Sequence, residues 1–169
     1  MEITLDQLLA SREQRAARQQ ELLTKYPHST LVCLTVIMPG SVKRNFFSII
    51  TANAAIQAML NKYEGSIEHF SLRDLVTGYE GYLVTNIDRE QAKRIACDIE
   101  DTHALGRLFD IDVLDEHGIP MSRSTVNHKP RRCLVCSNEA RYCMRAHTHT
   151  HNELQSRIKD MIEAYVHRV

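Results

Sequence analysis

"STLVCLTVIM" (residues 29–38) is apolar and rich in β-branched residues, a composition typical of a buried strand. Pro39 and Gly40 then turn the chain. In "KRNFFSIITANAAIQAMLNKY" (residues 43–63), apolar residues recur at helical spacing, which predicts a helix packed on the core and ended by Gly65. The chain therefore starts its core with a strand followed by a covering helix.

The next fifty residues repeat this alternation. "SIEHFSLRDLVT" (66–77) and "GYLVTNI" (81–87) predict two strands joined by a turn at residues 78–81. Asp88 is placed to cap a helix over "REQAKRIACDIEDTH" (89–103), and "RLFDIDVLD" (107–115) predicts a fourth strand. The order β-α-β-β-α-β favours an α+β, ferredoxin-like core, an antiparallel sheet with two helices on one face. A nucleotidyltransferase-like fold is the alternative.

Two segments flank this core. Thr4 and Gln7 form a capping-box pattern that predicts an N-terminal helix to about Tyr26. From Pro120 the sequence becomes basic and rich in cysteine and histidine, and it closes with an amphipathic helix from about Asn152. We expect one domain over residues 1–169: an N-terminal helix (1–27), an α/β core (29–118) and the Cys/His-rich segment with its helix (119–169).

Composition excludes several classes of protein. Lysine plus arginine equals aspartate plus glutamate, 21 each, which argues against nucleic acid or an acidic membrane as partner. Five cysteines are too few for a disulfide scaffold and favour a reducing cytoplasm. No apolar run approaches the roughly 20 residues that span a bilayer. The first residues lack the features of a signal peptide. We expect a cytoplasmic protein.

Two aspartates interrupt the apolar fourth strand. Asp110 and Asp112 are two residues apart, so they project from the same face while Phe109, Ile111 and Val113 point to the other. A carboxylate pair of this kind suits Mg²⁺, which takes one or two carboxylates together with substrate phosphates. Arg107 lies just upstream and can clamp a phosphate with two hydrogen bonds. The alternative is an exposed strand face whose aspartates pair with arginines.

The segment "PRRCLVCSNEARYCMRAHTHTH" (130–151) points to a second metal. The spacing of Cys133, Cys136, Cys143 and His147 suits a structural zinc site. A redox C-x-x-C, or buried cysteines beside a surface histidine run, are the alternatives. The densest basic cluster of the chain lies here, which favours a polyanionic small molecule as ligand; it consists of Lys129, Arg131, Arg132, Arg141 and Arg145.

Four motifs resemble one known family over nearly the whole chain. They are "GRLFDIDV" (106–113), "RRCLVC" (131–136), "SREQRAARQ" (11–19) and "MPGSVK" (38–43). The sequence resembles the apo-citrate lyase phosphoribosyl-dephospho-CoA transferases, also called citrate lyase holo-acyl-carrier-protein synthases. The resemblance implies transfer of the phosphoribosyl-dephospho-CoA group from 2'-(5''-triphosphoribosyl)-3'-dephospho-CoA to a serine of the citrate lyase acyl carrier protein, with release of pyrophosphate.

The resemblance also implies roles for residues. Asp110 and Asp112 would hold Mg²⁺ and act with Arg107 in catalysis, and the substrate would contact Gly106, Lys43, Lys129, Arg131 and Arg132. Nucleotidyltransferases in general have Gly-Ser or Gly-Gly where this chain has Gly106-Arg107, and they use a third carboxylate.

Other roles are candidates by position alone. They are Asp115 and Glu116 as that third carboxylate, His103 as general base, and Arg12, Arg15 and Arg18 as a docking stripe for an acidic carrier.

Two functions of other classes remain open. One is a non-catalytic ferredoxin-like domain that binds an anionic metabolite through the basic cluster. The other is a zinc-containing nucleic-acid-binding protein, which the neutral charge and the lack of an aromatic-rich basic strand disfavour.

Overall fold

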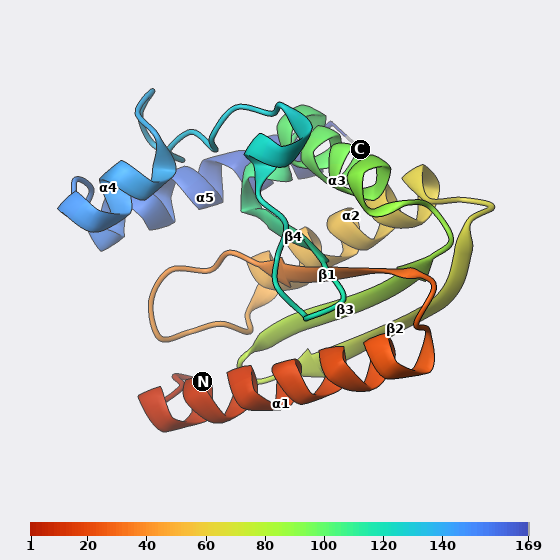
Figure 1. The fold of residues 1–169 in the computed structure, drawn as a ribbon. Coiled ribbons are helices and arrows are strands. Elements are labelled where there is room, and N and C mark those ends of the chain that lie inside the picture. Colours follow the sequence, from red (N-terminus) through yellow and green to blue (C-terminus); the bar gives the residue numbers. More distant parts are fainter. Residues whose placement is uncertain (169) are drawn as a thin grey trace.

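The computed structural model describes residues 1–168 and contains, within them, five α-helices and one four-stranded sheet (Figure 1). In chain order the elements are α1 (Leu5–Lys25), β1 (Thr30–Val36), α2 (Phe46–Lys62), β2 (Ile67–Leu75), β3 (Gly78–Thr85), α3 (Arg89–Thr102), the 3-10 turn η1 (Gly106–Leu108), β4 (Phe109–Leu114), the 3-10 turn η2 (Arg123–Val126), α4 (Ala140–Ala146) and α5 (His151–Val166). Among these residues no helix is both long and apolar enough to span a bilayer.

The sheet is antiparallel throughout, in the order β2-β3-β1-β4. β1 lies inside the sheet because its apolar residues can be buried on both faces, as the sequence predicts. Its residue Thr35 is opposite Glu80 of β3 on one side and Asp110 of β4 on the other. An antiparallel sheet combined with helices confirms the α+β class.

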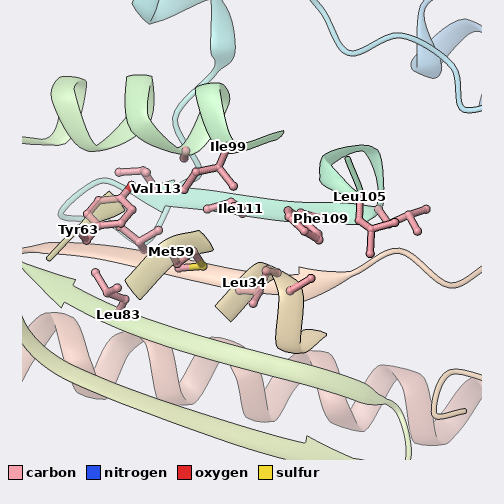
Figure 2. Close-up of a cluster of buried hydrophobic side chains, with 14 of the residues drawn as sticks. Leu34, Met59, Tyr63, Leu83, Ile99, Leu105, Phe109, Ile111 and Val113 are labelled. Carbon is pink, nitrogen blue, oxygen red and sulfur yellow. The ribbon is translucent and has the colours of Figure 1, made fainter. Parts of the chain in front are cut away.

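One face of the sheet carries the main core. Figure 2 shows Leu34, Leu83, Phe109, Ile111 and Val113 of the sheet gathered with side chains of α2 and α3. Ile158 and Ile162 of α5 are buried in the same cluster, so the predicted docking of the closing helix is confirmed. This face contains the apolar half of β4, as strand alternation requires.

α1 covers the other face (Figure 1). Leu22 packs there with Leu31 and Cys33 of β1, Tyr82 of β3 and Leu114 of β4. The predicted capping box is present, since Thr4 accepts the Gln7 N–H and Gln7 accepts the Thr4 N–H. Asp88 caps α3 as predicted. The apolar cluster on this second face therefore has fewer buried residues than the main core, and polar residues lie beside it.

The hairpin turn differs from the prediction. The turn occupies residues 76–77, whereas residues 78–81 lie inside β3. Gly81 lies in the strand and not in the turn, and a Cβ there would lie 3.2 Å from the Leu34 side chain of the neighbouring strand. Gly78 directly follows the two-residue loop and has φ +119°, a conformation that glycine adopts without strain. Close strand packing, as well as turning, therefore explains these glycines.

Candidate active site and metal centre

Asp110 and Asp112 project from the face of β4 that looks toward α1, while their neighbours Phe109, Ile111 and Val113 are buried on the other. Their partners across β1 are Thr35 and Cys33. The structure thus brings the two carboxylates to one face, as the sequence predicts. Within residues 1–168 no third acidic, histidine or cysteine side chain joins them to form a group of metal ligands.

Asp110 is held at the edge of the sheet by one arginine. Arg131 donates from Nη1 to Asp110 Oδ1 at 3.1 Å, and Thr35 Oγ1 donates to Oδ2 at 3.3 Å. Arg131 Nη2 also donates to the backbone carbonyls of Phe109 (2.5 Å) and Arg107 (3.3 Å). Because β4 is an edge strand, these bonds satisfy carbonyls that no further strand covers.

Asp112 is more enclosed than Asp110. Burial raises the pKa of its carboxyl, and the negative charge of Asp110 raises it further. The positive charges of Lys93, Arg131 and Arg15 only partly oppose these effects. Burial and the neighbouring carboxylate therefore disfavour the ionised form of Asp112, and a cation bound beside the pair would favour it.

Arg107 is a cationic side chain whose charged form is disfavoured by its surroundings. It is half-buried in η1, and burial followed by the positive charge of Arg131 lowers the pKa of its guanidinium. Arg107 has no ion pair among the residues that the structure describes. Two neighbouring guanidinium groups, one of them without a carboxylate, form a place where an anion such as a phosphate is favoured.

Glu100 is a member of this site that sequence reasoning missed. Its side chain is 4% exposed; Oε1 accepts the Ile111 N–H at 2.8 Å and Oε2 accepts Arg123 Nη1 at 2.7 Å. Arg131 Nη1 lies 3.7 Å from Oε1, so this arginine lies between Glu100 and Asp110. Burial raises the pKa of Glu100. The only sequence signal was an acidic residue on the inward side of a predicted amphipathic helix.

The remaining predicted substrate residues make no hydrogen bond or ion pair with Asp110 or Asp112 among residues 1–168. Lys43 is half-buried and donates from Nζ to the Met38 carbonyl at 2.5 Å; burial and then Arg12 lower its pKa. Lys129 and Arg132 are exposed. Gly106 is buried, and a Cβ there would lie 2.4 Å from the Glu100 carbonyl oxygen. Packing against α3 is thus sufficient to explain this glycine.

The candidates for a third carboxylate and for a base lie elsewhere. Asp115 accepts the N–H groups of His117 and Ile119 in the turn after β4, and Glu116 pairs with Arg89. His103 ends α3 and packs against Phe109 with the two rings tilted, at 4.9 Å between ring centres, on the opposite face from Asp110. Burial lowers the pKa of His103.

The predicted arginine stripe of α1 is partly engaged inside the protein. Glu80 of β3 is 2% exposed and accepts hydrogen bonds from Arg15 (2.9 Å), Tyr82 (2.7 Å) and Arg73 (3.4 Å). Arg18 pairs with Glu21 of the same helix. Sequence reasoning missed Glu80 because it placed residues 78–81 in the hairpin turn, whereas Glu80 lies inside β3.

The Cys/His segment forms a second site, with one correction to its ligands. The Sγ atoms of Cys133, Cys136 and Cys143 and a ring nitrogen of His149 all lie within 4.8 Å of one another, so they can hold a metal ion. The sequence predicted His147 as the fourth ligand, whereas the structure brings His149 to the three thiols. His147 is the left-handed residue, with φ +46°, that ends α4 and turns the chain so that His149 comes to Cys136 (3.4 Å).

The cysteine thiols of this cluster differ in pKa. Burial favours the neutral Cys133, but hydrogen bonds from the backbone of Cys136 and Val135 and from the other two thiols lower its pKa to about 7. Burial and hydrogen bonds to the other thiols raise the pKa of Cys143 to about 11. Such a set of closely spaced thiols with one histidine is the donor set that zinc prefers.

The two sites are joined by a short stretch of chain. Arg131, which contacts Asp110, also accepts the Ala140 N–H on its carbonyl at 2.8 Å, and Cys133 N–H donates to the Asn138 carbonyl at 2.7 Å. These two backbone hydrogen bonds join the beginning and the end of the loop between Arg131 and α4, which contains Cys133 and Cys136 of the thiol cluster. Any ion held by the cysteines would fix this loop and, through it, Arg131.

Comparison with known proteins identifies the family. The sequence model of the family described as "Apo-citrate lyase phosphoribosyl-dephospho-CoA transferase" matches residues 3–165, which include both sites. The chain belongs to this family. A Streptococcus pyogenes serotype M18 protein, named as a probable transferase of this kind, is 33% identical over 98% of this chain and 88% of its own length. A transferase of the same name from Escherichia coli O1:K1 / APEC is 33% identical over 95% of this chain and 88% of its own length.

A longer relative shares only part of its length with this chain. "Protein CitXG" of Haemophilus influenzae is 34% identical over 95% of this chain, and the match spans 35% of that protein. The resemblance inferred from the four sequence motifs is therefore confirmed at the level of the family.

Proposed function

We propose that this protein transfers the phosphoribosyl-dephospho-CoA group from 2'-(5''-triphosphoribosyl)-3'-dephospho-CoA to a serine of the citrate lyase acyl carrier protein. Family membership over residues 3–165 supports this activity. The observation that carries the site is at the start of β4, where Asp110 and Asp112 share one face of the strand and Arg131 contacts both Asp110 and the backbone carbonyl of Arg107.

The reaction needs groups that bind a triphosphate and stabilise its departing part. The serine oxygen attacks the α-phosphorus, the bond to pyrophosphate breaks, and the serine proton is released as the phosphodiester forms. Arg107 and Arg131 would bind phosphate oxygens, because their planar guanidinium groups form two parallel hydrogen bonds with such anions. Lys43 and the exposed Lys129 and Arg132 would add positive charge around the edge of the sheet.

Asp110 and Asp112 fit Mg²⁺, because they lie on the same face of β4 and this ion commonly takes one or two carboxylates from the protein. With two carboxylates and no third protein ligand in residues 1–168, the remaining coordination positions would fall to water and substrate phosphates, as is usual for this ion. Mg²⁺ would neutralise charge on the triphosphate and its pyrophosphate leaving group. Arg131 would keep Asp110 in place while Asp112 stays ionised.

At the second site we propose a structural zinc ion bound by Cys133, Cys136, Cys143 and His149. Four closely spaced sulfur and nitrogen donors are typical of closed structural zinc sites. The segment that holds them contributes few side chains to the main core, so a bound ion would supply much of its stability.

The fold type and the cellular location are two further inferences. We infer a ferredoxin-like core, supported by the element order β1-α2-β2-β3-α3-β4 in a fully antiparallel sheet. We also infer a cytoplasmic location, supported by five cysteines that are all free thiols.

A transfer assay tests the proposed function. Protein, apo acyl carrier subunit, precursor and Mg²⁺ are incubated, and the intact mass of the carrier is measured. We expect a mass gain equal to the prosthetic group, lost with chelator and with Asp110→Ala, and kept with Glu90→Gln on the exposed side of α3. Absence of the gain at any Mg²⁺ concentration would contradict the proposal. Binding of an anionic metabolite without transfer would then favour the non-catalytic alternative, which the names of the relatives do not favour.

A further inference from the structure

α4 exposes basic and apolar side chains together. Arg141 and Arg145 are exposed and have no ion pair among residues 1–168. Tyr142 is 62% exposed and Met144 73%, while Cys143 alone points inward to the thiol cluster. Along a helix these four residues fall on one broad outward arc with the arginines in the middle. Large exposed apolar side chains beside unpaired charges are characteristic of surfaces that bind another protein.

Local charge distinguishes this surface from the one on α1. From Lys129 to His147 the chain has five basic residues and one acidic residue, Glu139, within a protein of zero net charge. Residues 1–25 have four basic and four acidic residues, and Arg15 and Arg18 are already paired with Glu80 and Glu21. An acidic partner would therefore find uncompensated positive charge on α4 rather than on α1.

The position of α4 also suits a protein that must reach the active site. Figure 1 shows α4 with the start of α5 at the outer edge of the molecule, away from the sheet. The same loop that carries Cys133 begins with Arg131, which contacts Asp110. A partner seated on α4 would thus be fixed to the segment that holds the phosphate-binding arginine.

We propose that α4 is the docking surface for the acyl carrier subunit, with Arg141 and Arg145 facing carboxylates of the carrier and Tyr142 and Met144 packing against its apolar side chains. This inference rests on the proposed transfer reaction, in which the carrier is the acceptor. An acidic surface on the carrier would be the charge complement of this surface, and the charge reversals below test for it.

The test separates carrier binding from chemistry. We expect Arg141→Glu combined with Arg145→Glu to raise the KM for the carrier about tenfold or more, with the KM for the triphosphoribosyl precursor unchanged. Tyr142→Ala is expected to raise the carrier KM in the same direction. Arg94→Glu, on the exposed side of α3, controls for reversal of a surface charge, and Arg12→Glu tests the surface on α1.

A binding measurement completes the test. The apo carrier with its acceptor serine replaced by alanine is titrated into each variant, so no turnover is needed. Weaker binding by the α4 variants alone would support the proposal. Unchanged carrier binding and KM in the α4 variants, or a loss only in Arg12→Glu, would overturn it while transfer by the unsubstituted protein still stands. Failure of the unsubstituted protein to transfer would instead contradict the proposed function.

Discussion

Arg131 and Asp110 lie 21 residues apart in the sequence and are joined by an ion pair of 3.1 Å. The same guanidinium donates to two carbonyls at the start of β4 and stands beside Glu100. One side chain from the Cys/His segment thereby completes the edge of the sheet at the carboxylate pair. Substitutions in that segment should therefore alter the position and the charge environment of Asp110 and Asp112.

Asp112 and Asp110 should respond differently to loss of charge. Burial and Asp110 raise the pKa of Asp112 in the folded protein, so stability falls as the pH rises from the unfolded-state pKa of this carboxyl toward its folded-state pKa. We expect Asp112→Asn to raise the melting temperature at pH 7 without Mg²⁺. Asp110→Asn should not raise it, because it weakens the pair with Arg131. Thermal unfolding measures both; a lower melting temperature for Asp112→Asn would contradict this account.

Both asparagine variants should lose transfer. Each removes one of two carboxylates that stabilise the charged site, so we expect a fall in kcat/KM of ~100-fold or more. The carrier mass assay measures the loss, with Glu90→Gln as the control. If Asp112→Asn is more stable and fully active, the carboxylate pair does not serve the reaction.

The pH profile should depend on Mg²⁺. Because the pKa of Asp112 is raised, activity should fall on the acid side at a pH above the ordinary aspartate range near 3.9. A higher Mg²⁺ concentration favours the ionised form of the two carboxyl groups, so it should move this acid limb of the activity profile to lower pH. Initial rates at two Mg²⁺ concentrations across pH test the idea. An acid limb that is independent of Mg²⁺ would argue against metal binding by this pair.

Arg131→Lys should be a poor replacement. Lysine keeps the charge but cannot form the hydrogen bonds to Asp110, Phe109 and Arg107 together. We expect a loss of about 1–3 kcal/mol in the free energy of unfolding and a higher KM for the precursor. Urea unfolding and steady-state kinetics measure these. Arg132→Lys, at the neighbouring exposed position, should leave stability unchanged.

Glu100 offers a matched pair of substitutions. Glu100→Ala leaves the Ile111 N–H and Arg123 without their buried acceptor, and we expect it to cost roughly 2–4 kcal/mol of unfolding free energy. Glu100→Gln keeps an acceptor for Ile111 and removes a charge that burial disfavours, so it should cost less. Equal destabilisation by both variants would show that the charge, and not the hydrogen bond, is what matters.

Removal of the proposed zinc should loosen the Cys/His segment without unfolding the sheet. We expect Cys136→Ser to lower the bound zinc from one ion per chain, and to increase hydrogen exchange of residues 131–149 while β1 and β3 stay protected. The KM for the precursor should rise because Arg131 loses its support. His147→Ala should keep the zinc and His149→Ala should weaken its binding; the reverse result would favour His147 as the fourth ligand.

The sequence by itself determined the order of the elements of the core and the N-terminal caps of α1 and α3. β-branched runs, helical spacing and capping residues act over a few neighbouring residues, so β1, α2, α3 and α5 were predicted close to their observed bounds. The period of two along β4 is likewise sufficient to place Asp110 and Asp112 on one face of the strand.

Only the tertiary structure decided which distant residues complete the sites. Glu100 and Arg131 meet at the edge of β4, and Glu80 is buried beneath α1, because the sheet order and helix packing bring them there. The choice of His149 over His147 depended on a left-handed turn at the end of α4, which the sequence did not predict. Contacts of this kind depend on chain-wide geometry, whereas sequence patterns report only local conformational preference and burial.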